Sequence, residues 1–433
     1  MSTLLNQLQQ DLRYDLTNAC VQCGYCLPVC PTYLTMEKET HSPRGRINLV
    51  KMVAEGKIKD INQIREPLEL CVGCRACETA CPTGVQYERI LDSAKKVLEK
   101  HKTYKPSVRI IRNILFKHVF PKQKVMVSLG NLIWLYQKTG LQKMAHTTKI
   151  IDLLPYHLGE YERTLPILPS NHNRKKESTL KNTNQKPKIK VAFFQGCIMQ
   201  GIYQRINHYT VELMKLANIE VVIPENQTCC GALHAHSGGH EQAIALAKQN
   251  IDVFEKLDID YIVNNAGGCG AALNEYDQLL TDDPDYAEKA KRFVAKVRDI
   301  SQVLVEASPL PLKKQVNEIV TYQRSCHMTN VQKIKEEPLE LIKQIPGLKL
   351  VEMKRPNMCC GSGGIYNLIH YEESMKILNL KMDTVKETHA STIITTNPGC
   401  LIQMQKGVID QGLQQKVRVV HLVELLAEST GIM

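Results

Sequence analysis

Short apolar runs alternate with helically patterned segments along the second half of the chain. Each run is four or five residues long and reads as a buried strand. The segments 242–257 and 374–386 instead place apolar residues at helical intervals. Because strands that alternate with helices form parallel, doubly wound sheets, we predict such an architecture here. The predicted strands are 191–194, 261–264, 319–322 and 392–396.

The first half of the chain is helical in pattern. Apolar residues recur at helical intervals over 46–55, where Gly56 is placed to end the helix, and over 91–100. The next seventy residues are helical and basic and contain the only tryptophan, Trp134, so they are interpreted as a connector. Residues 171–190 carry seven Lys or Arg against one Glu, which is typical of a solvated linker or of a basic patch for a partner or membrane surface. We place the domains at 1–100, 101–170, 171–189, 190–305 and 306–433.

Two short cysteine runs near the N-terminus carry the strongest chemical signal. Each reads C-x2-C-x2-C-x3-C-P, the thiolate spacing that holds a cubane iron–sulfur cluster, with the fourth cysteine ligating the other cluster. Zinc is the alternative, but zinc sites pair two C-x2-C knuckles and do not use eight thiolates in two identical quartets. We therefore expect two [4Fe-4S] clusters. Their ligands are Cys20, Cys23, Cys26 and Cys81 for cluster 1, and Cys71, Cys74, Cys77 and Cys30 for cluster 2.

The helical pattern between these runs predicts a helical type of ferredoxin domain, with helices framing the clusters. Arg44 and Arg46 are candidates for tuning a cluster potential by charge or hydrogen bonding, or they belong to a solvated loop and helix start.

The second half of the chain contains an internal duplication. A cysteine, a Cys-Cys-Gly triplet and a further cysteine recur at intervals of 32 and 39 residues in one unit and 33 and 40 in the next. Each predicted strand ends in a turn with a cysteine just past it, and sites in parallel sheets form at the carboxyl ends of strands. These residues are candidates for a further cluster, or they are buried thiols without metal, since free Cys is a common core residue. They are Cys197, Cys229, Cys230, Cys269, Cys326, Cys359, Cys360 and Cys400.

Composition narrows the class of protein. The chain has 433 residues, 43% of them hydrophobic and 23% charged, which is typical of a globular protein of two or three domains. Its start lacks the basic and apolar regions of a signal peptide, and no apolar run is long enough to span a bilayer. We therefore expect a cytoplasmic protein with reduced thiols and no transmembrane segment. The net charge of +11 falls to about +5 if three clusters each contribute roughly −2, so nucleic acid is not an expected partner.

The duplicated cysteine pattern resembles the cysteine-rich CCG domain of heterodisulfide reductases, of anaerobic glycerol-3-phosphate dehydrogenases and of lactate-utilisation proteins. The whole layout is similar to the iron–sulfur subunit of glycolate oxidase. The motifs that carry the resemblance are the two cysteine runs, Ser42-Pro-Arg-Gly-Arg46 and the two CCG repeats. The resemblance implies an α-helical ferredoxin domain followed by an α/β domain made of two parallel-sheet CCG repeats.

The resemblance also implies a function. It predicts an oxidoreductase subunit that relays electrons beside flavin-containing subunits oxidising glycolate or another 2-hydroxyacid, to an acceptor such as a quinone at the inner face of the membrane. The chain alone is expected to be inactive on the acid. Alternatives are a disulfide or quinone reductase subunit, the iron–sulfur subunit of a lactate or glycerol-3-phosphate dehydrogenase, and a non-catalytic assembly factor.

The sequence departs from the disulfide reductases at one point. Their repeats close with C-x2-C, whereas Ala272 and Gln403 stand at the matching positions here. The histidines His234, His236 and His327 lie near the repeat cysteines and are candidates for ligands or proton carriers, or are ordinary hydrogen-bonded side chains.

Overall fold

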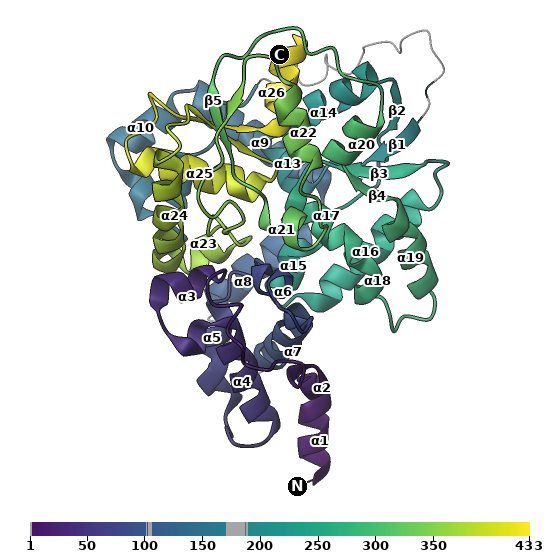
Figure 1. Ribbon diagram of the computed structural model, residues 1–433, viewed down its shortest axis with the longest axis vertical. Coiled ribbons are helices and arrows are strands. Elements are labelled where there is room, and N and C mark those ends of the chain that lie inside the picture. The colour runs from purple at the N-terminus through teal and green to yellow at the C-terminus, as the bar shows by residue number, and fades with distance from the viewer. Residues whose placement is uncertain (1, 101, 103–105, 170–186, 188) are drawn as a thin grey trace.

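The computed structural model describes residues 2–100, 102, 106–169, 187 and 189–433. The basic linker predicted over 171–189 lies outside these residues, except for 187 and 189. In Figure 1 the N-terminal part forms one end of the molecule, and the two sheet-containing units lie side by side above it.

The N-terminal part is helical, and none of its described residues forms a strand. Helix α4 begins at Pro43, whose missing N–H costs nothing at this position, and Ser42 caps it by accepting a hydrogen bond from the Gly45 N–H at 3.0 Å. The helix ends at Ala54, just before Gly56, which adopts a positive φ of 73°. The elements are α1 (Ser2–Asp11), α2 (Tyr14–Thr17), α3 (Pro31–Met36), η1 (Glu39–His41), α4 (Pro43–Ala54), η2 (Ile61–Ile64), α5 (Arg65–Glu69), α6 (Ala76–Thr79) and α7 (Tyr87–Lys100).

The connector is a layer of short helices that passes behind the sheets in Figure 1. Helix α9 packs on the first repeat through Met126, whose backbone and side chain approach Gly201 so closely that a Cβ there would lie 2.9 Å from the Met126 methyl carbon. Further along, α11 reaches the second repeat, where Tyr161 donates a hydrogen bond to Gln403 at 3.1 Å. The elements are α8 (Pro106–Ile114), η3 (Leu115–Val119), α9 (Gln123–Lys138), α10 (Leu141–Thr147), η4 (Ile150–Leu153), η5 (Pro155–His157) and α11 (Leu158–Glu162).

Two parallel four-stranded sheets confirm the predicted α/β architecture. Their strand orders, β2-β1-β3-β4 and β6-β5-β7-β8, are the same order repeated. The strands are β1 (Ile189–Phe193), β2 (Ile219–Val222), β3 (Tyr261–Asn264), β4 (Val297–Asp299), β5 (Ile319–Tyr322), β6 (Lys349–Leu350), β7 (Thr392–Thr395) and β8 (Arg418–His421).

The predicted strands correspond to β1, β3, β5 and β7, the two central strands of each sheet. The edge strands β2, β4, β6 and β8, which have two to four residues each, were not predicted. Edge strands are buried less completely than central ones, so they lack the uniform apolar run that marks a buried parallel strand.

Helices flank both sheets. The predicted helices 242–257 and 374–386 correspond to α16 and α24. In the first repeat the helices are α13 (Cys197–Gly201), α14 (Gln204–Leu216), α15 (Ala232–His236), α16 (His240–Phe254), α17 (Gly267–Asn274), α18 (Tyr276–Leu279), α19 (Ala287–Lys296) and α20 (Ile300–Glu306). In the second they are α21 (Cys326–Asn330), α22 (Glu337–Gln344), α23 (Tyr366–Ile369), α24 (Tyr371–Lys386), α25 (Pro398–Asp410) and α26 (Leu422–Thr430).

The two repeats share one apolar core. Leu213 of α14 in the first repeat packs in the same cluster as Leu422 and Leu426 of α26 in the second. The opposite face of each sheet has a separate core. The repeats therefore form one body.

Candidate metal centres

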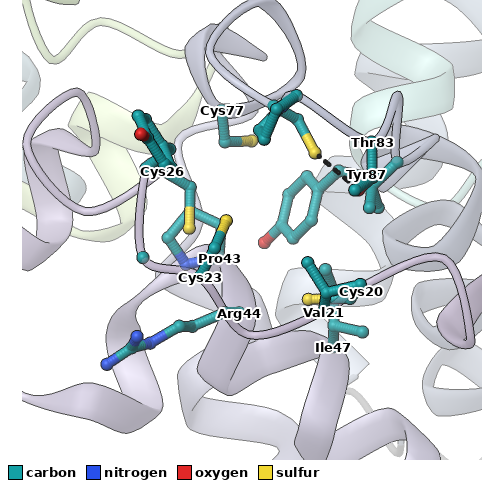
Figure 2. A pocket seen from close by; sticks show the side chains of 15 residues that line it. Cys20, Val21, Cys23, Cys26, Pro43, Arg44, Ile47, Cys77, Thr83 and Tyr87 are labelled. Carbon is teal, nitrogen blue, oxygen red and sulfur yellow. Dashed lines mark hydrogen bonds between the residues drawn. The ribbon is translucent and has the colours of Figure 1, made fainter.

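The cysteines predicted for cluster 1 surround one cavity. Cys20, Cys23 and Cys26 lie on the loop after α2 (Figure 2). Cys81 follows α6 and lines the same cavity. The loop turns around the cavity through Gly24, which adopts a φ of +87°. Two polar side chains form hydrogen bonds with these sulfurs. Gln22 Nε2 donates to Cys20 Sγ at 3.4 Å, and Thr83 Oγ1 lies 3.4 Å from Cys81 Sγ.

The cysteines predicted for cluster 2 line a second, more deeply buried cavity: Cys30, Cys71, Cys74 and Cys77. Burial and the neighbouring thiols raise the pKa values of Cys74 and Cys77 well above that of a free thiol. Tyr87 lines both cavities and donates a hydrogen bond to Cys71 Sγ at 3.5 Å, so it lies between the two quartets. Across the described residues, no three His, Cys, Asp or Glu side chains are placed to hold a single metal ion.

The surroundings of Arg46 indicate whether the second cavity suits an anionic group. The residue is 1% exposed, and its guanidinium donates hydrogen bonds to the Pro67 carbonyl at 2.6 Å and to Thr32 Oγ1 at 3.0 Å. None of the described carboxylates forms an ion pair with it. Burial disfavours this cation, yet the ionisable Tyr87, Cys71 and Cys30 around it keep its pKa above the usual value. A buried cation requires a nearby negative charge, and a cluster held by four thiolates carries about −2. The cavity fits such a cluster.

Arg44, the other candidate for tuning, is arranged differently. It forms an ion pair with Glu39 at 2.7 Å and donates to the Gln22 carbonyl at 3.0 Å, so it holds the first cysteine loop from outside.

The four cysteines of the first repeat are brought together in the interior. Cys197 Sγ lies 3.6 Å from Cys229 Sγ, and Cys230 is in hydrogen-bonding contact with both Cys229 and Cys269. These contacts lower the pKa of Cys230 well below that of a free thiol and raise the pKa of its two neighbours. Asn250 fixes the loop by donating to the Cys229 carbonyl at 3.1 Å.

The four cysteines of the second repeat converge in the same way. Cys326 contacts Cys359, and Cys360 contacts both Cys359 and Cys400. The buried Lys381 lies beside them, donating to the backbone carbonyls of Arg355 at 2.9 Å and Pro356 at 3.3 Å. Burial lowers the pKa of Lys381 to about 8, although the three nearest thiols oppose the shift. Convergent thiols beside a buried cation again suit an anionic cluster.

The second repeat is in direct contact with the cluster 2 loop. Cys74 and Val72 pack in one apolar cluster with Cys359 and Tyr366. The amide of Asn330 donates to the Cys74 carbonyl at 2.9 Å. The helices that carry Cys269 and Cys326, α17 and α21, in turn pack on each other. The quartets therefore form a continuous row from the N-terminal helices through the second repeat to the first.

The three histidines make other contacts. His234 Nε2 lies 2.7 Å from the Phe116 carbonyl, and His327 Nε2 lies 2.9 Å from the Gly73 carbonyl. The ring of His236 packs against that of His327. Hydrogen bonds to backbone carbonyls account for His234 and His327 without a ligand role.

Sequence reasoning missed Tyr87 and Lys381. Neither belongs to a cysteine motif, and each reaches a quartet through the packing of its helix beside a cysteine loop. The one available signal for Lys381 is a lysine on the apolar face of a predicted helix.

Comparison with known proteins agrees with this arrangement. Family models match for a 4Fe-4S dicluster domain at residues 17–85, for the linker region of the glycolate oxidase iron–sulfur subunit at 107–165, and for the cysteine-rich CCG domain at 191–274 and 320–405. These matches confirm that iron–sulfur clusters are the cofactors.

Three relatives are informative. The chain is 44% identical to the probable glycolate oxidase iron–sulfur subunit of Bacillus subtilis, over 100% of this chain and 98% of that one. It is 28% identical to the glycolate oxidase iron–sulfur subunit of Escherichia coli, over 92% and 93% of the two chains. It is 33% identical to lactate utilization protein A of Halalkalibacterium halodurans, over 55% of this chain and 96% of that one.

A crystal structure of a hypothetical protein from Helicobacter pylori has a similar fold. The TM-score is 0.52 at 7% identity, over 94% of this chain and 71% of that chain.

Proposed function

The chain belongs to the family of glycolate oxidase iron–sulfur subunits, and on that premise we propose that it relays electrons from the flavin of partner dehydrogenase subunits to an acceptor such as a quinone. The observation that carries the proposal is the continuous row of four cysteine quartets, two of which are beside a buried cation. Each cluster supplies a one-electron redox step when bound.

The chain's own residues hold the clusters and control their surroundings. Cys20, Cys23, Cys26 and Cys81 hold the first cluster, and Cys30, Cys71, Cys74 and Cys77 hold the second. In the repeats the two convergent quartets hold one centre each. Arg46 and Lys381 offset negative charge at two of the four sites. Burial keeps bulk water away from most thiolates of the two repeats, whereas Cys23 of cluster 1 is exposed.

We propose glycolate as the acid oxidised by the complex, with lactate and glycerol 3-phosphate as the alternatives that related subunits suggest. The subunit then works on the cytoplasmic side, at the inner face of the membrane where a quinone is available. Bond chemistry on the acid belongs to the flavin partners.

The test uses the chain prepared without oxygen, alone and with its flavin partners. Alone, it is expected to hold at least eight iron atoms and to leave glycolate unoxidised when an artificial dye is the acceptor. The complex is expected to reduce the dye with glycolate in preference to lactate. Turnover by the flavin-free chain, or zinc in place of iron, contradicts the proposal.

A ligand variant assigns the second cluster. Cys74→Ser is expected to remove about four iron atoms and to leave the cluster 1 signal, because Cys74 belongs to one quartet only. Cys23→Ser is the matched variant for cluster 1. Equal loss of both signals in both variants would contradict the division of ligands.

One observation favours a second function, reduction of a small acceptor at the first repeat. A cavity of about 570 Å³ lies between α7 and this repeat, and Cys230, Gly268 and Ala272 line it. Ala272 stands where the disulfide-reducing relatives have their additional cysteine. Thiol production from a disulfide by the isolated, pre-reduced chain would identify this activity.

A further inference from the structure

The connector exposes an unusual amount of apolar surface. Of the 21 large apolar side chains that are exposed among the described residues, sixteen lie between Ile110 and Ile167. Leu153 and Ile167 are 82% and 92% exposed. Soluble proteins seldom leave such a concentration uncovered, and larger exposed patches mark interaction sites. We call the exposed side chains of residues 106–167 the connector surface.

The apolar residues follow the helices in stripes. On α9, Val125, Leu129, Leu132 and Leu135 are spaced by four, three and three residues, which places them on one face. The opposite face carries Met126, which is buried against the first repeat. Helix α9 therefore has two apolar faces. One is buried in the protein's own core, and the other is exposed.

A second stripe lies on α8. Ile110, Ile111 and Ile114 are exposed, whereas Phe116, just beyond the helix, is buried beside His234. Helix α10 continues the pattern with exposed Leu141 and Met144, and it packs on α9. The stripes of α9 and α10 therefore belong to helices that pack on each other, and η3, which contacts both α8 and α9, joins the α8 stripe to them.

The charges on the connector surface indicate whether it binds a lipid surface or another protein. The connector surface includes six exposed lysines, whereas its one exposed carboxylate among the described residues, Asp152, forms an ion pair with Arg163 at 2.7 Å. Lysine is depleted in protein–protein interfaces, whereas basic residues that alternate with apolar ones are typical of helices lying on anionic lipid. Tryptophan is enriched at membrane–water interfaces, and the Lys138 ammonium lies 4.9 Å from the ring centroid of Trp134. The six lysines are Lys117, Lys122, Lys124, Lys138, Lys143 and Lys149.

We propose that the connector surface binds the headgroup region of an anionic lipid bilayer, with α8, α9 and α10 lying on the membrane. No helix of the described residues is long and apolar enough to cross one. The purpose of this docking rests on the proposed function, since it brings the chain to a membrane-borne acceptor.

The inner side of the connector indicates which centre is then nearest the lipid. Thr228, next to Cys229, donates a hydrogen bond to the Pro121 carbonyl at 2.6 Å. Met126 packs in the same core as Cys197. The connector therefore lies directly over the quartet of the first repeat, between it and the membrane.

The test is sedimentation of the iron-loaded, full-length chain with vesicles of phosphatidylcholine, with and without phosphatidylglycerol. Binding is expected only when phosphatidylglycerol is present, and it should weaken as salt is raised. Leu132→Asp/Leu153→Asp should lower vesicle partitioning by about tenfold or more, since each leucine loses an apolar contact and gains a charge that lipid repels. The matched control is Ile223→Asp/Ile369→Asp, two exposed apolar residues outside the connector, which should bind as the parent does.

Three outcomes overturn the proposal: no vesicle binding by the parent, equal loss in the control pair, or unchanged binding by the leucine pair. If the leucine pair instead fails to assemble with the flavin subunits, the surface is a protein interface. Glycolate oxidation with a soluble dye, measured on the same complexes without vesicles, tests the relay separately. A variant that keeps this activity and loses vesicle binding supports the proposal, whereas an inactive parent complex argues only against the proposed function.

Discussion

The two CCG repeats have the same strand order and the same four converging cysteines, yet they have different neighbours. In the second repeat, Cys359 packs with Val72 and Cys74 of the N-terminal helices. In the first, the connector covers Cys197 and Cys229 on one side, and Cys230 lines an open cavity on the other. Duplication thus provided two equivalent quartets, and the segments added around them distinguish an inward-facing site from an outward-facing one.

The repeats also differ in charge close to the sulfur atoms. Lys381 on α24 is fully buried beside the second quartet. The equivalent helix of the first repeat, α16, presents Asn250, which is neutral and donates to the Cys229 carbonyl and the Tyr276 hydroxyl. Two sites built from the same ligands can therefore have different reduction potentials.

Removing the adjacent cysteines of either repeat should have the largest effect. Cys359→Ser/Cys360→Ser removes two of four thiolates from the inward-facing site, and Cys229→Ser/Cys230→Ser does so in the outward-facing one. Each should lower electron transfer from glycolate to quinone by more than about 100-fold, since losing ligands exceeds the roughly 10–100-fold cost of losing a supporting contact. The measurements are turnover of the complex, iron content and the reduced-state spectrum.

The difference between the repeats is confirmed if each double variant loses only the reduced-state spectrum of its own repeat. It fails if both pairs keep full iron and full turnover, because the repeat cysteines would then be structural.

The second prediction uses equivalent positions at the ends of β4 and β8. Asp299 and His421 each cap the following helix, and both are buried. Burial raises the pKa of Asp299 to about 6, against the hydrogen bonds from Ser301. Burial lowers the pKa of His421 to about 4. The shifts have opposite signs, and each corresponds to about 3 kcal/mol.

Asp299 and His421 have opposite effects on how the free energy of unfolding changes with pH. The Asp299 contribution is present below its ordinary pKa of 3.8 and is lost as pH rises through about 6. The His421 contribution is present above its ordinary pKa of 6.5 and is lost as pH falls toward about 4. Asp299→Asn should therefore make the free energy of unfolding fall by about 1 kcal/mol per unit as pH drops from 6.5 to 5, and His421→Asn should make it rise. Denaturant unfolding between pH 5 and 7 measures both slopes; slopes of the same sign would contradict the assignment.

The smallest expected effect concerns Lys381. Lys381→Met removes a buried positive charge beside the second quartet, so adding an electron there becomes less favourable. We expect the reduction potential of that centre to fall by an amount on the order of 59 mV, a tenfold change in a one-electron equilibrium. Lys376→Met, on the same helix but paired with Glu373 at the surface, is the control and should leave the potential unchanged. A redox titration that shows equal shifts in both variants, or a shift in the first repeat's signal, would contradict this difference between the repeats.

Local spacing carried most of what the sequence predicted. Cysteines three or four residues apart wrap one cavity through a few backbone turns, so the quartets of the N-terminal domain follow from the motif. The repeat quartets could be placed because one cysteine follows each predicted central strand and the Cys-Cys-Gly triplet recurs at the same interval in both repeats. The contact of Cys74 with Cys359 depends on packing between segments hundreds of residues apart, and the position of Lys381 depends on how α24 packs beside the cysteine loop, neither of which local periodicity records. The connector looked featureless for a related reason: its apolar residues have ordinary helical spacing, and only the structure shows that they face outward.

The packing of α26 on α14 has a consequence for how the chain is made. Residues 422–430 complete the core of a repeat that begins more than two hundred residues earlier. A ribosome therefore synthesises the first sheet long before its partner helix exists, and the apolar face of α14 stays uncovered until residues 422–430 have left the exit tunnel. Until then, this apolar face of the nascent chain has to be shielded from aggregation in another way.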